Sequence, residues 1–367
     1  MTMNALRWLV VAVCLVGGSL RANAQDAAVA PPAPEKPLRV LLFADGPTRE
    51  YQFARRLFVN EQDKKRAEVS ACLQSGDPTM PRFQDLPADR VLREFPASLE
   101  GFDLIVAFDP DWTRLSEKQL ESLGPWVKQG GGLALVAGPV HTGKLAQPAH
   151  RKQLKPILDL YPVEVDEAPL AVQAIHMPWR LTFAAGAADM KFLSFDDGPQ
   201  ALAHWDAFFS TTSRRATDED RQRIAALIAD LDSTRFETRE RATRALEKIG
   251  FPAQRQLQKA LEGKPALEVR ARIERLLERL ELPDFGRGFY SYHPVKKVKP
   301  AAEVVATFSD PDARLPDGKE HPYLVKMTHG QGKVLYLGSG ETWRLRLFKE
   351  AYHERFWLQL GRYVAGK

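Results

Sequence analysis

Polar and aromatic side chains follow the apolar segments of this sequence, and these side chains are the ones that could carry out chemistry. A histidine beside a carboxylate could act as a general base, and several carboxylates together could bind a metal ion. An enzyme or a small-ligand binder could use a cluster of this kind, built mainly from the acidic residues and the histidine. The residues placed in this way are Asp45, Asp109, His141, Glu341, Trp343 and Arg344, and Gly138 stands beside them at the end of the run 132–138.

Each of these residues also has a structural interpretation. Aspartates such as Asp45 and Asp109 often cap turns and helices. His141 could be a solvated loop residue that bonds a neighbouring carbonyl, and Trp343 could pack beside an arginine–carboxylate pair. The three carboxylates of the set lack a metal-binding spacing motif, so we predict neither a metal nor another cofactor.

The cysteines offer little chemistry. Cys14 lies in the N-terminal apolar segment, which leaves Cys72 as the second cysteine of the chain. Cys72 stands in the alternating segment AEVSACLQS, where we expect a strand with a buried small hydrophobic residue at this position. No CxxC pattern is present, so the sequence indicates neither an intrachain disulfide nor a zinc site.

Apolar runs of strand length alternate with segments of helical periodicity. This order predicts a mostly parallel sheet with helices on both faces, in which ligands bind at the carboxyl ends of the strands. One helix is expected to begin at Ser116, which forms a capping box with Gln119, and to end at Gly130. The other expected elements are strands at 38–46, 67–75, 102–109, 132–138 and 332–340, and helices at 49–62 and 352–364.

A block of different character occupies residues 213–282. Four amphipathic helices are expected there, separated by short turns that contain Gly or Pro. Residues 237–247 are repeated 31 residues later, at 268–278, with six of eleven residues identical. A repeat of this period predicts a stacked α-solenoid fragment, and the shared composition of two charged helices is the alternative.

Arginines recur in both copies of this repeat. They are either solvated side chains paired with nearby glutamates or part of a surface that binds a partner. The arginines are Arg239, Arg241, Arg244, Arg270, Arg272 and Arg275.

The N-terminus has the features of a secretory signal peptide. Arg7 precedes the apolar run 8–16, and the small residues 22–24 follow it. We predict cleavage after Ala24, with an uncleaved membrane anchor as the alternative. Residues 25–37, rich in Ala and Pro, are expected to form an extended tether. No second apolar run approaches the length of a membrane span, so we expect a soluble periplasmic or secreted protein.

The charge of the chain excludes one class of partner. The 367 residues carry a formal net charge of +5, and basic and acidic residues are interspersed along most of the chain. A nucleic-acid-binding surface normally shows clustered positive charge. We therefore predict no nucleic-acid partner.

Several motifs resemble a bacterial family of class I glutamine amidotransferase-like domains. The resemblance covers residues 38 to about 210 and resumes near residue 288, and the block between resembles a HEAT or armadillo repeat. It implies an amidotransferase-like, flavodoxin-like α/β domain at 38–212 and 283–367, with an α-solenoid-like insertion at 213–282. The motifs are RVLLFADGPTREYQFARRLF, CLQSGDP, FPASLEGFDLIVAFD, GGGLALVAGPVH and HGQGKVLYLGSGETWRLR.

The resemblance also shows which catalytic parts are missing. A working amidotransferase of this kind needs a cysteine at the turn after a central strand and a later His-x-Glu pair. Here the turn is 136–139, which contains no thiol, and Pro139 lacks the N–H that an oxyanion hole would need. Ser339 stands two residues before Glu341, where the pair would need histidine.

These observations predict a non-catalytic protein of the periplasm or the cell exterior. The amidotransferase-like domain would be a degenerate scaffold, and the helical insert would bind a protein partner, with larger envelope complexes as expected associates. The alternative is a hydrolase or a sugar-active enzyme that uses the carboxylates and the histidine at the strand ends.

Overall fold

A computed structural model describes residues 36–75, 86–172, 178–194, 202–209, 218–249, 253–279 and 288–367. The expected signal peptide, and the expected tether as far as residue 35, lie outside these residues. Within the described part of the chain, every helix is too short or too polar to cross a membrane.

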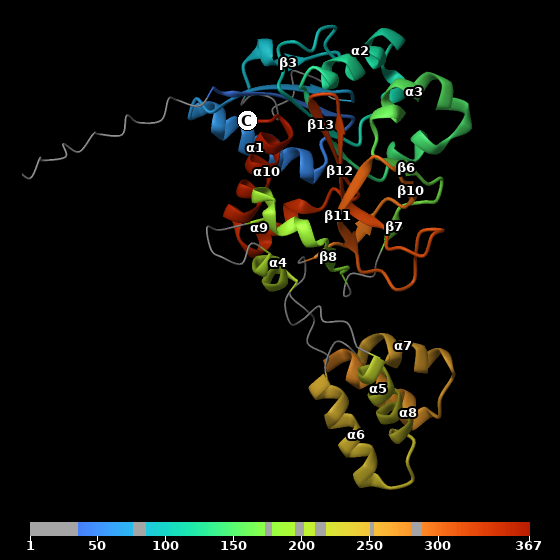
Figure 1. Ribbon diagram of the computed structural model, residues 1–367. Coiled ribbons are helices and arrows are strands. Elements are labelled where there is room, and N and C mark those ends of the chain that lie inside the picture. Colours follow the sequence, from blue (N-terminus) through green and yellow to red (C-terminus); the bar gives the residue numbers. More distant parts are fainter. Residues whose placement is uncertain are drawn as a thin grey trace, which may run out of the picture. The chain divides into compact units, whose positions relative to one another are not determined.

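A large mostly parallel sheet forms the centre of an α/β fold (Figure 1). Its strands come from both sides of the helical block at 213–282, because a C-terminal strand lies beside one from the first half of the chain. In chain order the strands are β1 (Leu38–Ala44), β2 (Ala67–Leu73), β3 (Val91–Leu92), β4 (Leu104–Phe108), β5 (Gly132–Val136), β8 (Leu181–Phe183), β11 (Ala302–Phe308), β12 (Pro322–His329) and β13 (Gly332–Leu337).

The order of strands in this sheet is β3-β2-β1-β4-β5-β13-β12-β11-β8. The first six strands run parallel, and β12, β11 and β8 continue the sheet in antiparallel pairs. The chain leaves β1 for β2 on one side and then returns to β4 on the other. Ligands of open α/β sheets bind at such a reversal of strand order. Two small antiparallel pairs complete the strands, β6 (Val163–Val165) with β10 (Val295–Val298) and β7 (Ala171–Val172) with β9 (Ser291–Tyr292).

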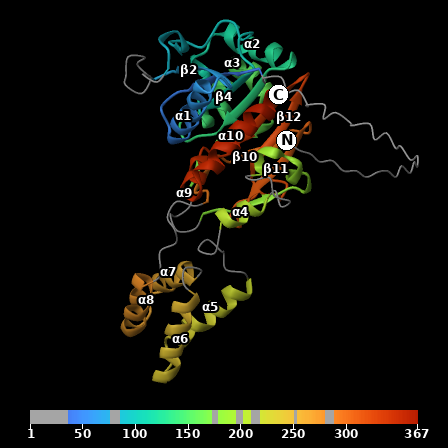
Figure 2. The same ribbon diagram turned by 90° about the vertical axis from the view of Figure 1, so that its left-hand side faces the viewer.

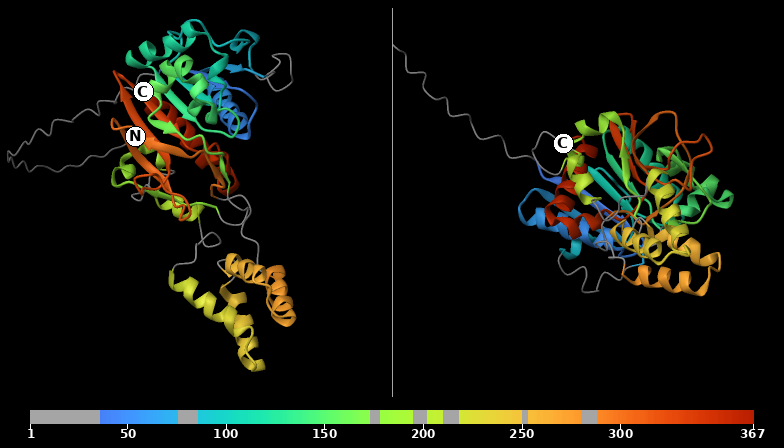
Figure 3. Two further views of the ribbon diagram at one scale, coloured as in Figure 1. Left: turned by 90° about the vertical axis from the view of Figure 1, so that its right-hand side faces the viewer. Right: turned by 90° about the horizontal axis from the view of Figure 1, so that it is seen from below.

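Helices cover both faces of the sheet, as the alternation of its side chains requires. In β1, Val40 and Leu42 belong to the core on the side of α1 and α10, whereas Leu41 and Phe43 belong to the core on the side of α2 and α3. Figure 3 shows the blue α1 and the red α10 together on one side of the strands. The helices of the α/β fold are α1 (Arg49–Asp63), α2 (Glu117–Lys128), α3 (Arg151–Leu160), α4 (Ala203–Phe208), α9 (Leu345–Phe348) and α10 (Glu350–Val364).

Local signals determine where two of these helices begin and end. The hydroxyl of Thr48 accepts a hydrogen bond from the N–H of Tyr51 and caps α1. Ser116 and Gln119 form the expected capping box of α2. Gly130 follows this helix with a φ of +112°, a conformation that side chains rarely adopt, and so ends it as predicted.

The helical block has a hydrophobic core of its own. Its helices pack on one another through their apolar faces (Figure 2), with Ile224, Leu246, Leu257 and Ile273 among the buried residues. The four helices predicted here are confirmed. They are α5 (Asp218–Asp230), α6 (Phe236–Ile249), α7 (Gln254–Glu262) and α8 (Leu267–Arg279).

The antiparallel half of the sheet is the feature that the sequence analysis did not predict. All five expected strands are present as β1, β2, β4, β5 and β13, and the expected helices as α1, α2 and α10. The sheet then continues through β12, β11 and β8, whose segments mix polar and apolar residues without a clear period. The prediction of a mostly parallel sheet is confirmed, and these three strands extend it.

Candidate functional site

A pocket of about 210 Å³ opens at the carboxyl edge of the parallel strands. Residues that follow β4, β5 and β13 line it, together with the first turn of α1. The lining residues are Thr48, Arg49, Glu50, Phe108, Asp109, Val136, Ala137, Gly138, Pro139, Leu170, Ser291, Ser339, Gly340, Glu341 and Trp343. The pocket therefore lies where the strand order predicts a ligand site.

Asp109 holds the loop that closes one side of the pocket. Its carboxylate is buried and accepts hydrogen bonds from the backbone N–H groups of Val140, His141 and Thr142, at 2.7–3.2 Å. The hydroxyl of Thr142 donates a further bond of 2.7 Å. Asp109 has a φ of +44°, in the left-handed region that aspartate tolerates better than most residues. The carboxylate is thus a cap for this loop, one of the two interpretations that the sequence allowed.

The turn after β5 fits closely around the same carboxylate. A Cβ atom at Gly138 would lie 2.6 Å from Oδ2 of Asp109, so only glycine allows this approach. The N–H of Gly138 donates to the hydroxyl of Thr142 at 2.9 Å. Because Pro139 has no N–H, neither residue offers a backbone donor to a bound oxyanion.

Glu341, a second carboxylate of the pocket, is held in a similar way. Its Oε2 accepts hydrogen bonds from the backbone N–H groups of Tyr290 and Ser291, at 2.5 and 2.9 Å. Its Oε1 accepts two from Arg344, at 2.9 and 3.2 Å. This carboxylate joins the chain after β13 to the segment that leads into β9.

A third carboxylate of the pocket, Glu50, was not among the predicted residues. It is almost fully buried, and its Oε1 accepts hydrogen bonds from the hydroxyl of Thr342 and the indole N–H of Trp357. Its Oε2 accepts from the backbone N–H of Trp343 at 3.0 Å. His353 Nε2 lies 3.6 Å from Oε1. An acidic residue in the first turn of a helix gave no distinct signal in the sequence.

Arginines stack on the aromatic residues at the edge of the pocket. The guanidinium of Arg344 lies 4.5 Å from the ring centroids of both Tyr290 and Trp343, and that of Arg49 lies 5.0 Å from Trp343. Together with the ion pair from Arg344 to Glu341, this is the packing interpretation expected for Trp343.

Ser339 has the least satisfied polar group of the pocket. The residue is 1% exposed and lines the pocket, and its hydroxyl has no hydrogen-bond partner among the described residues. Ser339 occupies the position where the resemblance to amidotransferases would require histidine. None of the described residues that line the pocket is histidine or cysteine.

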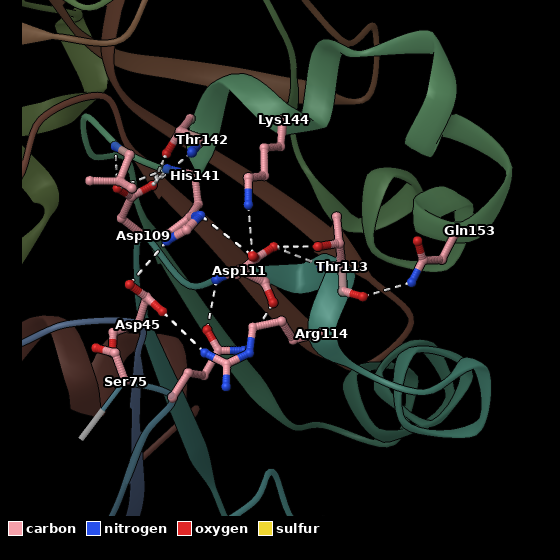
Figure 4. A network of polar contacts seen from close by, with 12 residues as sticks. Asp45, Ser75, Asp109, Asp111, Thr113, Arg114, His141, Thr142, Lys144 and Gln153 are labelled. Atoms are coloured by element: carbon pink, nitrogen blue, oxygen red, sulfur yellow. Dashed lines mark hydrogen bonds and ion pairs between the residues drawn. The ribbon is translucent and has the colours of Figure 1, made fainter. Parts of the chain in front are cut away.

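A second polar cluster lies at the same edge of the sheet (Figure 4). His141 Nε2 lies 3.0 Å from Oδ2 of Asp45, close enough for an ion pair but without hydrogen-bond alignment. Oδ1 of Asp45 lies 3.5 Å from Arg114. Neither Asp45 nor His141 is a lining residue of the pocket.

Asp111 connects this cluster to the loop after β5. It accepts a hydrogen bond of 2.7 Å from Lys144, caps the short helix Trp112–Arg114 through the N–H of Thr113, and lies 3.6 Å from Nδ1 of His141. Burial alone would raise the pKa of Asp111, but the hydrogen bonds from Lys144 and Thr113 outweigh it and hold this pKa below its usual value.

Cys72 lies in the apolar core on the side of α2. It is 1% exposed, and burial raises the pKa of its thiol to about 12. The thiolate is therefore not formed at neutral pH. Its expected place as a buried strand residue is confirmed.

The structure divides the predicted strand-end residues into two groups. Asp109, Gly138, Glu341 and Trp343 line the pocket, and Arg344 stacks on the ring of Trp343. Asp45 and His141 contact each other in the second cluster. Among the described residues, no three His, Cys, Asp or Glu side chains are placed to hold a metal ion.

The arginines of the helical block also divide into two groups. Arg239 and Arg272 are half-buried and form ion pairs between α6 and α8, with Glu268 and Glu240 respectively. Four others are exposed, and one of them, Arg270, pairs with Glu274 on its own helix. The exposed arginines are Arg241, Arg244, Arg270 and Arg275.

Comparison with known proteins gives similarity of structure alone. No protein-family model matches the chain, and no curated protein matches it in sequence. The cytoplasmic protein STM3548 from Salmonella typhimurium is similar over 89% of this chain and 99% of its own, with 13% identity and a TM-score of 0.44.

Two further solved structures are similar at the same low level. The cytoplasmic protein STM1381 from Salmonella typhimurium LT2 has 12% identity and a TM-score of 0.42. The match covers 89% of this chain and 99% of that protein. A beta-galactosidase from Rahnella sp. R3 has 11% identity and a TM-score of 0.37. The match covers 89% of this chain and 31% of that protein.

Proposed function

We propose that this protein is a non-catalytic scaffold, with an α/β domain that holds a helical block for binding a protein partner. The observation that carries the proposal is how the carboxylates at the strand ends are hydrogen-bonded. Those of Asp109 and Glu341 each accept two or more hydrogen bonds from backbone N–H groups. A carboxylate whose oxygens already accept several hydrogen bonds within the protein has little bonding capacity left for a substrate.

The residues around the pocket support the same proposal. Acyl transfer needs a nucleophile, a base within hydrogen-bond reach of it, and donors for the oxyanion. Ser339 is a hydroxyl without a base beside it, and the donor at Gly138 is bonded to Thr142. His141, the histidine of the second cluster, contacts Asp45 and does not line the pocket.

Ammonia release from L-glutamine tests the non-catalytic part of the proposal. The mature protein, residues 25–367, is expected to release no more ammonia than a heat-denatured sample. The variant Glu341→Gln serves as a matched control, since a glutaminase of this family needs a carboxylate there. Saturable release by the unaltered protein that Glu341→Gln abolishes would contradict the proposal.

The helical block is proposed as a solenoid-like interaction module. Its support is the repeat at 31 residues, together with the ion pairs Arg239–Glu268 and Arg272–Glu240, which join α6 to α8. Stacked helical hairpins present side chains of equivalent helices as one surface. The four exposed arginines of α6 and α8 would give that surface a positive charge suited to an acidic partner.

Affinity capture from the native envelope tests the interaction role. We expect one or more partners to be captured by the mature chain and lost when residues 213–282 are deleted. A full-length variant with Arg241, Arg244, Arg270 and Arg275 changed to serine should also lose them. A control with Lys248→Ser and Lys259→Ser, both exposed on the same block, should keep them. Partners that survive the deletion would overturn the role of the block. The N-terminal segment 1–24 is the basis for seeking them outside the cytoplasm.

A further inference from the structure

The helical block exposes two large apolar side chains at equivalent places of its repeat. Phe236 is 62% exposed and Leu267 is 84% exposed. The two residues are 31 positions apart, which is the period of the repeat. Each is the first residue of its helix, Phe236 of α6 and Leu267 of α8. A side chain that is mostly exposed contributes little to a hydrophobic core, so packing within the block does not explain either residue.

An ion pair shows that the first turns of these two helices lie side by side. The guanidinium of Arg239 lies 5.8 Å from the ring centroid of Phe236. Its Nε lies 3.4 Å from Oε1 of Glu268, which directly follows Leu267 in the chain. Single apolar residues scattered over a surface are normal, whereas apolar residues gathered in one place indicate a site of interaction. Phe236 and Leu267 therefore indicate such a site at this end of α6 and α8.

Two exposed arginines follow the apolar residues at the same spacing on both helices. Arg244 stands eight residues after Phe236, and Arg275 stands eight residues after Leu267. Eight residues of helix span about 12 Å at about 1.5 Å per residue, and positions i, i+4 and i+8 lie within one face of a helix. Each apolar residue and its arginine thus form a stripe, and the adjacent helices α6 and α8 carry one stripe each.

The block leaves the charge of these two arginines without a partner of its own. Arg244 and Arg275 each donate to a backbone carbonyl of their own helix, and neither forms an ion pair with a described side chain. The hydrogen bond from Arg272 lowers the pKa of Glu240, and the charges of Arg244 and Arg275 lower this pKa further. All three arginines therefore lie near one carboxylate, and Arg272 already holds it at 2.7 Å.

The remaining charges of α6 and α8 do not offset this excess. Arg270 pairs with Glu274 at 2.9 Å. Glu237 stands four residues before Arg241, the spacing of a helical ion pair. A second copy of the chain that used the same stripes would bring like charges together, whereas an acidic partner would neutralise them. Over 236–249 and 267–277 the cations are Arg239, Arg241, Arg244, Lys248, Arg270, Arg272 and Arg275, and the carboxylates are Glu237, Glu240, Glu247, Glu268 and Glu274.

We propose that the paired stripes, Phe236 and Leu267 with Arg244 and Arg275, bind an acidic amphipathic segment of a partner protein. The inference rests on the proposed role of the helical block and names the chemistry of its partner. Apolar side chains of the segment contact Phe236 and Leu267, and its carboxylates pair with Arg244 and Arg275. Since the two kinds of contact are about 12 Å apart, a helical segment places them about eight residues apart.

The combination of contacts favours a protein segment over other acidic partners. An acidic polysaccharide that pairs with the arginines alone leaves Phe236 and Leu267 exposed. A membrane surface binds helices through an apolar face that continues over several turns, whereas each stripe has one large apolar side chain at its start. A peptide supplies apolar and acidic side chains at a fixed spacing.

Peptide display on the full mature chain, residues 25–367, tests the proposal. The probe is a library of random peptides of about 16 residues, enough for about four helical turns. We expect the enriched peptides to combine large apolar residues with acidic ones. Fluorescence anisotropy then gives their affinities for the natural protein and for each variant.

Two double variants separate the apolar from the basic contacts. Phe236→Ser with Leu267→Ser should weaken the enriched peptides about tenfold or more, because two apolar contacts are lost. Arg244→Ser with Arg275→Ser should weaken them about threefold and reduce the salt dependence of binding. Circular dichroism melting is expected to be unchanged in both, because all four side chains are exposed.

Two further variants serve as matched controls. Leu347→Ser removes a leucine that is 53% exposed on α9 of the α/β fold. Arg223→Ser with Lys259→Ser removes two exposed cations from α5 and α7 of the same block. Both variants should bind the enriched peptides as the natural protein does.

Three results would overturn the proposal. They are a library without enriched peptides, enriched peptides that lack acidic residues, and affinities that Phe236→Ser with Leu267→Ser leaves unchanged. Binding of heparin or of phosphatidylglycerol vesicles through the arginines, in place of the peptides, would assign the surface to another class of partner and would also overturn it.

Failure of this proposal is distinguishable from failure of the proposed function. Envelope partners that are lost on deletion of 213–282 but retained by Phe236→Ser with Leu267→Ser would overturn the paired stripes and leave the role of the block standing. Partners that survive the deletion would overturn the role itself.

Discussion

Two groups of carboxylates lie at one edge of the sheet and are bonded in different ways. In the pocket, Asp109 and Glu341 accept hydrogen bonds from backbone N–H groups of other segments. In the cluster beside it, Asp45 and Asp111 contact mainly the side chains of His141, Arg114 and Lys144. The first group joins distant segments of the chain through their backbones, whereas the second contacts mainly side chains, and the backbone bond that Asp111 accepts comes from Thr113, two residues away.

This difference shows why residue type alone does not identify a catalytic site. Aspartate, glutamate and histidine at strand ends are the residues that acid–base chemistry would use. The partner of each carboxylate decides its role, because an acceptor already bonded to several N–H groups has little capacity left for a substrate. The predictions below test this contrast through the stability of the α/β fold.

Tryptophan fluorescence is suited to these measurements. Of the seven tryptophans, six lie in the α/β part of the chain and one in the N-terminal segment, with none between residues 213 and 282. Urea unfolding followed by this signal therefore reports the α/β fold and not the helical block.

The largest effect is expected at Asp109. Asp109→Ala leaves the N–H groups of Val140, His141 and Thr142 without their acceptor, and the free energy of unfolding should fall by about 3–5 kcal/mol. Asp109→Asn keeps one oxygen and a side chain that tolerates the left-handed backbone, so its loss should be smaller. Equal stability of Asp109→Ala and the natural protein would remove the distinction between the two groups.

A smaller loss is expected at Glu341. Glu341→Gln keeps an acceptor for Tyr290 or Ser291 but weakens the pair with Arg344, which should cost about 1–3 kcal/mol. Urea unfolding gives the value, and Arg344→Gln, which removes the other half of the pair, is the companion variant. If Glu341→Gln were as stable as the natural protein, the carboxylate would be free for another task.

Lys144→Ala should cost about 1 kcal/mol at neutral pH and less in acid. The pKa of Asp111 is lowered in the folded state. The charged carboxylate therefore adds its full contribution to the free energy of unfolding above the unfolded pKa of about 4, and this contribution is lost as the pH falls through the folded pKa. The difference between variant and natural protein should therefore shrink below about pH 4. The exposed pair Lys155–Asp159 offers a control, because Lys155→Ala should change stability little at any pH. If the stability difference between Lys144→Ala and the natural protein stays constant down to pH 2, the ion pair between Lys144 and Asp111 is not its cause.

The smallest effect is expected at Asp45. Asp45→Asn weakens contacts with His141 and Arg114 that are partly exposed, so the loss should stay below about 1 kcal/mol and diminish further in high salt. Unfolding at low and high ionic strength provides the measurement. A loss as large as that of Asp109→Ala would mean that both clusters hold the fold equally.

The sequence was sufficient to locate the candidate residues but not to assign their roles. Apolar runs such as 102–109 and 332–340 predicted buried parallel strands, whose carboxyl ends place Asp109 and Glu341 at the same edge of the sheet. The hydrogen-bond partners were not predictable in the same way. Asp109 bonds to residues 31 to 33 positions later in the chain, which the left-handed turn at Asp109 and the packing of Gly138 bring into reach.

Ser339 and Glu50 escaped prediction for a related reason. A serine without a hydrogen-bond partner is a property of its three-dimensional surroundings and leaves no mark in the sequence. Glu50 resembles any acidic residue in the first turn of a helix, where such residues are common. The antiparallel strands β11 and β12 were missed because their segments carry no regular alternation, and pairing with β13 determines their structure.

Amide hydrogen exchange at Val140, His141 and Thr142 tests the central claim most directly. If Asp109 is committed to the main chain, these three N–H groups should exchange slowly in the natural protein, and Asp109→Ala should accelerate them while leaving the amides of β1 protected. Rapid exchange at all three positions in the natural protein would contradict the account, because the carboxylate would then be available to a substrate.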